Sequence, residues 1–181
     1  MPSVQRNGKA GAAELPMFGF ALSALLTQVT RDFPELSSKR VEVWMRNQPT
    51  LATVCSEEGK VVVALHAVLN HVDTPERVVG FILRHELLHM IIPSREVDGR
   101  NSAHPPEFWN VESGFPDRRM VWSWLLLVLG CCLRRDKSKE CMFVTRKWKA
   151  RMNDTRPSLD EIEHLLNGGS PLRAALGGRS F

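Results

Sequence analysis

The sequence predicts an α+β fold in one main domain. Three runs with strand-like composition lie close together between residues 39 and 66, and helical patterns precede and follow them. This grouping differs from the regular strand–helix alternation of a doubly wound parallel sheet. The chain has 181 residues, of which 43% are hydrophobic, so a core of useful size can form without disulfides or structural metals.

The first half of the chain predicts one helix and a small sheet. An amphipathic pattern from about residue 16 to residue 33 predicts the N-terminal helix. KRVEVWMR (39–46), LATVCS (51–56) and VVVALH (61–66) have strand-like composition and predict about three strands. EEGK, between the last two runs, predicts a tight turn whose glycine takes a positive φ, so that these two strands form an antiparallel hairpin.

A long helix is expected next. Thr74 is a typical N-cap residue, and Pro75 suits the first turn. The apolar segment VVGFILRHELLHMII (78–92) continues the helix, and Pro93 is expected to end it. The polar stretch at residues 94–106 contains glycine and prolines and is interpreted as a loop.

Further helices are expected in the last part of the chain. PEFWNVE begins one of them. Asp117 begins another, which carries the apolar run VWSWLLLVLGCCL (121–133) to about Arg135 as a buried helix. PSLDEIEHLL forms a third, which ends at two consecutive glycines.

The predicted domain covers residues 1–156, and residues 157–181 are expected to form a helical tail that is partly flexible. No membrane span is predicted, because the run at 121–133 is shorter than the roughly 20 residues that cross a bilayer. Four cysteines lie outside any C-x-x-C pair: Cys55, Cys131, Cys132 and Cys141. We interpret them as buried free thiols and expect a cytoplasmic protein.

Basic residues are concentrated after residue 116. Residues 117–156 contain 11 Lys and Arg against 4 Asp and Glu, whereas residues 1–116 contain 11 against 13. Such a concentration is typical of a solvated basic surface, and also of a surface that contacts nucleic acid. Both interpretations stay open.

Residues 84–90 read RHELLHM, which predicts a metal site. His85 and His89 are four residues apart, so a helix places both rings on one face, where they can bind one ion. Glu86 is offset by about 100° around the helix and is suited to contact a water on the metal instead of the metal itself. In this H-E-x-x-H arrangement two imidazoles hold zinc and the glutamate is a general base.

A catalytic zinc needs three protein ligands and one open position. The candidates for the third ligand downstream are Glu96, Asp98, His104, Glu107 and Glu112. We favour His104, because the preceding loop is long enough to return to the ion and the two following prolines stiffen the chain. Glu107 and Glu112 stay open as alternatives. The other histidines are expected to have polar surface or core roles: His66, His71 and His164.

VALHAVLN, TPERVVGFILRHELLH and DGRNSAHPPEFW together resemble the SprT-like and YgjP-like metallopeptidases, which are related to the WLM group. The resemblance covers about residues 61–109 and is specific at three histidines, one glutamate and the aromatic pair Phe108–Trp109. It implies a zincin-like metallopeptidase domain with three zinc ligands and a catalytic glutamate: His85, His89, His104 and Glu86.

Three features depart from that family pattern. Pro105 follows the third histidine, where SprT-like proteins commonly have glycine, and no C-terminal zinc ribbon is visible. The chain also contains no tyrosine, so an arginine or a histidine would have to stabilise the oxyanion that forms during hydrolysis.

The predicted function is zinc-dependent hydrolysis of peptide bonds in a peptide or protein substrate, with water activated by Glu86. The substrate is expected to pair with an exposed sheet edge, and residues 61–66 are the expected edge because they lead into the site helix. Two alternatives stay open. One is a non-proteolytic zinc-binding module, and the other is a nucleic-acid-associated SprT-like protein that uses basic residues 117–156.

Overall fold

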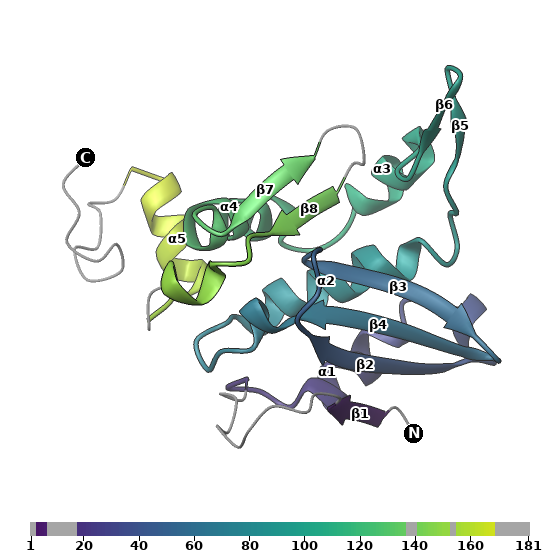
Figure 1. The fold of residues 1–181 in the computed structure, drawn as a ribbon, viewed down its shortest axis with the longest axis horizontal. Helices are drawn as coiled ribbons and strands as arrows, with labels where there is room; N and C mark the ends of the chain where they lie inside the picture. Colours follow the sequence, from purple (N-terminus) through teal and green to yellow (C-terminus); the bar gives the residue numbers. More distant parts are fainter. Residues whose placement is uncertain (1–2, 7–17, 137–140, 153–154, 169–181) are drawn as a thin grey trace.

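The fold is that of a computed structural model, which describes residues 3–6, 18–136, 141–152 and 155–168. Helices and sheets combine in an α+β arrangement, which confirms the predicted fold class. The main sheet has four strands in the spatial order β1–β2–β4–β3 (Figure 1). These strands are β1 (Ser3–Arg6), β2 (Arg40–Arg46), β3 (Ala52–Glu57) and β4 (Lys60–His66).

All three predicted strands form, and β1 is an additional one. β1 pairs with β2, and β2 pairs with β4, in parallel, whereas β3 and β4 form the predicted antiparallel hairpin. Its turn contains Glu58 and Gly59, with φ of 47° and 80°. This left-handed conformation at both central residues is the one that a two-residue hairpin turn favours.

The prediction that residues 61–66 form the sheet edge is wrong. β4 lies between β2 and β3, and β3 is the outermost strand on that side. Every residue from Val61 to His66 is buried, and a continuous apolar run of this kind is typical of a strand covered on both faces. The exposed edge that faces the rest of the molecule therefore belongs to β3 (Figure 1).

Two helices, α1 (Leu22–Thr30) and α2 (Glu76–Leu88), pack against each other and contribute to the core beneath the sheet. Their approach is close at Gly80, where an added Cβ would lie 3.2 Å from Leu25 Cδ1. The first helix is shorter than expected, since it begins at Leu22, and residues 7–17 lie outside the described residues.

Both expected ends of α2 need correction. Pro75, not Thr74, is the N-cap residue, and Thr74 is buried where its Oγ1 accepts a hydrogen bond from Arg156 Nη1 at 2.7 Å. The helix ends at Leu88 with His89 as its C-cap. It therefore stops before Pro93, and the C-cap position itself carries one of the three histidines of interest.

The second half contains two hairpins that the sequence did not predict. Asp98 and Gly99 take positive φ of 51° and 74° in a tight turn, which converts part of the expected loop into strands. The elements here are β5 (Arg95–Val97), β6 (Arg100–Ser102), α3 (Pro106–Glu112), α4 (Arg118–Leu129), β7 (Leu133–Asp136), β8 (Cys141–Val144) and α5 (Leu159–Leu166). Three short 3-10 helices complete the described chain: Pro34–Leu36, Ala67–Leu69 and Trp148–Ala150.

The helix expected to run to about Arg135 is α4, and it ends earlier, at Leu129. The chain then enters β7, and β8 brings it back beside the main sheet, where Leu51 N donates a hydrogen bond to Met142 O at 3.0 Å. α4 is only partly buried, since Leu126 and Leu127 are exposed. None of the described helices is both long and apolar enough to cross a membrane.

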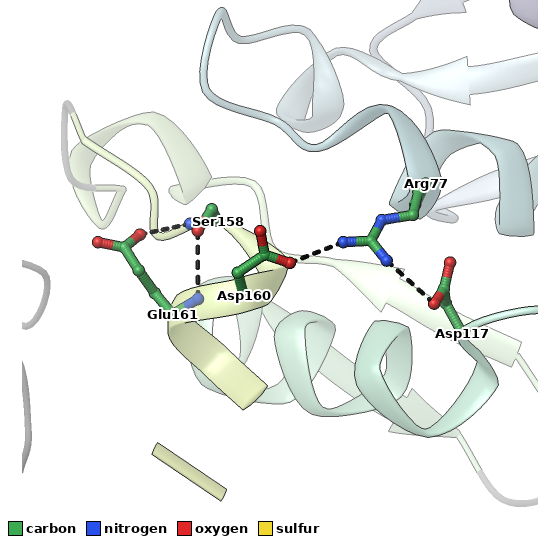
Figure 2. A network of polar contacts seen from close by, with 5 residues as sticks. All are labelled: Arg77, Asp117, Ser158, Asp160 and Glu161. Carbon is green, nitrogen blue, oxygen red and sulfur yellow. Dashed lines mark hydrogen bonds and ion pairs between the residues drawn. The ribbon is translucent and has the colours of Figure 1, made fainter. Parts of the chain in front are cut away.

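A polar network fixes α4 and α5 relative to α2 (Figure 2). Arg77, in the first turn of α2, donates to Asp117 at 3.2 Å and to Asp160 at 2.9 Å. Asp117 is the N-cap residue of α4, and Asp160 lies in the first turn of α5. α5 begins with a capping box between Ser158 and Glu161. One side chain thus connects the starts of three helices.

The described part of the expected tail packs on the domain. Leu159 and Ile162 of α5 are buried in the same hydrophobic core as α1, α2 and α4, and Trp124 Nε1 of α4 donates to Pro157 O at 2.7 Å. Residues 169–181, the rest of that tail, lie outside the described residues.

Candidate metal centre

Three histidines from two parts of the chain meet in one cluster. His85 lies in the last turn of α2, His89 is the C-cap of that helix, and His104 precedes α3. Each offers one ring nitrogen, and these nitrogens all lie within 4.8 Å of one another. The structure therefore brings together the three residues that the sequence analysis favoured as metal ligands.

The spacing of the nitrogens fits a bound metal ion. Nε2 of His85 and Nε2 of His104 are 3.2 Å apart. Two ligands that are each about 2.0–2.1 Å from a tetrahedral zinc would be roughly 3.3 Å apart. Three imidazoles also suit zinc among the biological divalent metals. The donor set and its geometry can therefore hold one ion, and a fourth ligand position would remain for a non-protein ligand.

Phe108 supports all three rings. It is fully buried, and its ring centroid lies 5.0 Å from that of His85, 4.5 Å from that of His89 and 4.7 Å from that of His104. Trp109 adds a contact with His104 at 5.0 Å. These aromatic contacts restrict the orientations of the imidazoles, so less conformational entropy is lost when they bind an ion.

Glu112 orients His85 from behind. Its carboxylate is fully buried, with Oε1 at 2.8 Å from His85 Nδ1 and Oε2 accepting a hydrogen bond from Arg118 Nε at 3.0 Å. Burial raises the pKa of Glu112, but the hydrogen bonds and charges of His85 and Arg118 outweigh it, so the pKa is lowered overall. We therefore assign the proton to Nδ1 of His85, which leaves its Nε2 lone pair for a metal.

His89 is held in its neutral form. Burial, followed by the charges of His85 and His104, lowers the pKa of His89 to about 3, and Glu112 opposes this effect. A neutral imidazole is the form that binds a metal, so His89 is ready to act as a ligand at neutral pH.

Glu86 lies beside the cluster without belonging to it. It follows His85 on α2, and only 8% of it is exposed. Burial raises the pKa of Glu86 to about 7, with His85 acting in the opposite direction. It lines the same groove as the histidines, which places a carboxylate where it can exchange a proton with a molecule in that groove.

The remaining ligand candidates lie elsewhere. Glu107 pairs with Arg95 at 2.6 Å, and Glu96 and Asp98 are exposed on the β5–β6 hairpin. Glu112 is the candidate that contacts a histidine of the cluster, through Nδ1 of His85. The sequence contained a signal for this, because Phe108 and Glu112 are four residues apart and so share one face of α3.

The other histidines lie outside the cluster. Nδ1 of His66 accepts a hydrogen bond from Val68 N at 2.8 Å, and burial lowers the pKa of His66 to about 4. Nδ1 of His71 accepts one from Asp73 N at 3.1 Å, and His164 is exposed on α5. Their contacts agree with the core and surface roles expected for them.

An open groove passes over the cluster. It begins along β3, crosses the three histidines and Glu86, and continues between α4 and the β7–β8 hairpin. The apolar run of α4 predicts a buried helix, so the sequence did not indicate that α4 belongs to the site. Arg118, Arg119 and Trp122 of α4 line the groove.

Several arginines of the basic segment, residues 117–156, make contacts within the molecule. Arg118 donates to Glu112, Arg151 donates to Cys131 O at 3.1 Å, and Arg156 is buried against Thr74. Nucleic-acid binding through residues 117–156 stays a prediction, and steeply salt-dependent binding would support it. All four cysteines are free, but only Cys132 is buried, so the expectation of buried thiols is wrong for the exposed Cys55 and Cys131.

Comparisons with models of protein families, with curated proteins and with solved structures found no match to this chain. The resemblance to SprT-like and YgjP-like metallopeptidases therefore stays a prediction.

Replacing Glu112 with glutamine should weaken metal binding by about 10–100-fold, the usual effect of losing a carboxylate that orients a metal ligand. Glutamine keeps the size of the side chain but loses the charge that His85 and Arg118 share. Zinc affinity is measured by competition with a chromophoric chelator. Glu107→Gln, on the same helix but paired with Arg95, is the matched control and should bind zinc normally. Equal zinc affinities in the two variants would show that Glu112 does not contribute to metal binding.

Proposed function

We propose that this chain is a zinc-dependent metallopeptidase with a zincin-like domain, which hydrolyses peptide bonds in peptide or protein substrates. One observation carries the proposal. A cluster of three imidazoles and a buried carboxylate, Glu86, lie together on an open groove that borders an exposed sheet edge. This combination supplies a metal site, a proton acceptor and a place for an extended chain.

His85, His89 and His104 would hold the zinc ion, which would act as a Lewis acid on water and on the scissile carbonyl. Glu86 accepts a proton from the attacking water and later delivers it to the departing amine. Glu112 and Phe108 keep the imidazoles in place during this exchange. Arg118 lines the groove and is 40% exposed on its side chain, so it is our candidate to stabilise developing negative charge in a chain without tyrosine.

The substrate is placed by β3. Because β3 is the outermost strand beside the groove, an extended peptide can add to it as a further strand, with main-chain hydrogen bonds for affinity and side-chain pockets for selection. β3 thus takes the role that the sequence analysis gave to residues 61–66. The peptide would then run along the line of the groove and across the histidines.

The proposal is tested by incubating the zinc-loaded protein with an unfolded protein substrate and identifying products by mass spectrometry. We expect new termini that appear with time and that a chelator suppresses. A protein that holds one zinc per chain but yields no products would instead fit the alternative of a non-proteolytic zinc-binding module.

A further inference from the structure

One face of α4 forms a wall of the groove. Arg119, Trp122, Ser123 and Leu126 all line it, and they are spaced at i, i+3, i+4 and i+7, so they form one stripe along the helix. The opposite side of α4 carries buried residues such as Val121 and Trp124. The stripe is therefore the surface that α4 presents to anything bound in the groove.

The stripe has an apolar end. Leu126 is 63% exposed, and Leu133 and Met142 line the groove there as well. Trp122 is half-buried and anchors the middle of the stripe against Phe81 of α2, with ring centroids 6.2 Å apart. A large apolar side chain that covered Leu126 would remove this surface from water, which is favourable.

The other end of the stripe is cationic. Arg118 and Arg119 are the arginines that line the groove, and Arg118 is already bonded to Glu112. Arg119 is exposed, and no ion pair of its side chain is found within the part of the chain that the structure describes. Its guanidinium is thus available to a carboxylate in the groove, which it can bind through two parallel hydrogen bonds.

The positions of Arg119 and Leu126 along α4 set the order and the spacing of the cationic and apolar ends of the stripe. Arg119 is at the end of α4 that contacts the metal cluster, through Arg118 and Glu112, whereas Leu126 is seven residues further on. At 1.5 Å per residue this separation is about 10 Å along the helix axis. An extended peptide covers about 3.3 Å per residue, so about three residues bridge the two ends.

From this arrangement we infer that the groove selects extended peptides in which a carboxylate binds Arg119 and a large apolar side chain, about three residues away, covers Leu126. This inference rests on the proposed function and names its substrate class. The carboxylate comes from an acidic side chain or from the C-terminus of the peptide. The first source gives an endopeptidase with acidic preference, and the second gives an enzyme that acts near C-termini.

The test measures binding without turnover, in the Glu86→Gln variant with zinc added. Short dye-labelled peptides are compared by fluorescence anisotropy. The reference peptide carries glutamate and leucine at the proposed spacing and ends in an amide. In the others, glutamine replaces the glutamate, serine replaces the leucine, or a free C-terminal carboxylate replaces the acidic side chain.

We expect at least one of two peptides, the reference peptide and the peptide with the free C-terminus, to bind about tenfold tighter than the glutamine and serine peptides. A difference of this size is what one charge-assisted hydrogen bond or one buried apolar side chain contributes. Adding Arg119→Gln should remove the preference for the carboxylate, and adding Leu126→Ser should remove the preference for leucine. Both variants should keep their zinc. Arg134→Gln, which changes an exposed arginine on β7, is the control and should keep both preferences.

Equal affinities for all peptides, a preference that survives Arg119→Gln, or no binding at all would overturn the inference. Displacement of the peptide by a single-stranded oligonucleotide, lost in Arg119→Gln, would assign this face to nucleic acid and would overturn it too. The proposed function is refuted by a different result. If the wild-type protein binds these peptides selectively but never hydrolyses them, it is not a peptidase. If it hydrolyses them without preference, only the inferred selectivity is wrong.

Discussion

Replacing Glu86 with glutamine is expected to slow peptide hydrolysis by about 10²–10⁴-fold, the usual contribution of a general base, while zinc content stays unchanged. Glutamine has nearly the same shape as glutamate but cannot accept the proton of the attacking water. Zinc should remain because Glu86 is not one of the three residues whose ligand atoms converge.

Turnover is measured on the substrate that the wild-type protein cleaves, and zinc is measured by elemental analysis on the same preparations. Glu76→Gln is the matched control, because Glu76 is an exposed glutamate in the first turn of the same helix. That variant should hydrolyse the substrate at the wild-type rate. Undiminished turnover in Glu86→Gln would refute the proposed mechanism, whereas loss of zinc would mean that Glu86 has a structural role.

Replacing His85 or His89 with alanine is expected to remove the zinc. Each change deletes one of three protein ligands, so affinity should fall by more than the roughly 100-fold that the loss of an orienting partner can cause. After dialysis against a weak chelator, wild-type protein should keep about one zinc per chain and the variants little. Circular dichroism verifies that the variants are folded.

His164→Ala is the control for this experiment, since His164 is an exposed histidine on α5, outside the cluster. It should bind zinc as the wild type does. If both His85→Ala and His89→Ala keep full zinc, the ion is held elsewhere and the cluster is a structural group of histidines.

The part of the site that lies on one helix could be predicted from the sequence. The relation between His85, Glu86 and His89 follows from the geometry of an α-helix alone. The placement of His104 depends on how the chain returns from β5 and β6, and the sequence only indicated it, through the stiff prolines and the aromatic pair that follow. The packing of Phe108 against all three rings supplies the physical reason for that placement.

One part of the fold that the sequence did not predict depends on long-range pairing. β4 contains a continuous apolar run, which indicates a buried strand, and the turn before it indicates β3 as one neighbour, yet nothing in its sequence indicates β2 as the other neighbour. The β5–β6 hairpin had a local signal in Asp98–Gly99, a dipeptide that favours tight hairpin turns. The end of α4 had no decisive local signal. Leu133 continues the apolar run of the helix, although it belongs to β7.

The role of α4 was missed for a related reason. Periodicity alone does not distinguish a helix that is buried all round from one with an apolar face on a groove. Its apolar run suggested burial, and the exposed fraction of Leu126 shows that one side is open. The specificity that we infer for the groove therefore depends on the structure and not on the sequence pattern.

A crystal structure of the protein with zinc, phased or verified by the anomalous signal of the metal, tests the central claim most directly. We predict one zinc ion, with a ring nitrogen of each of His85, His89 and His104 about 2.0–2.1 Å from it, and with Glu112 still bonded to His85. A structure in which a carboxylate of Glu107 or Glu112 binds the metal, with His104 turned to solvent, would contradict the three-histidine site and the family resemblance that it supports.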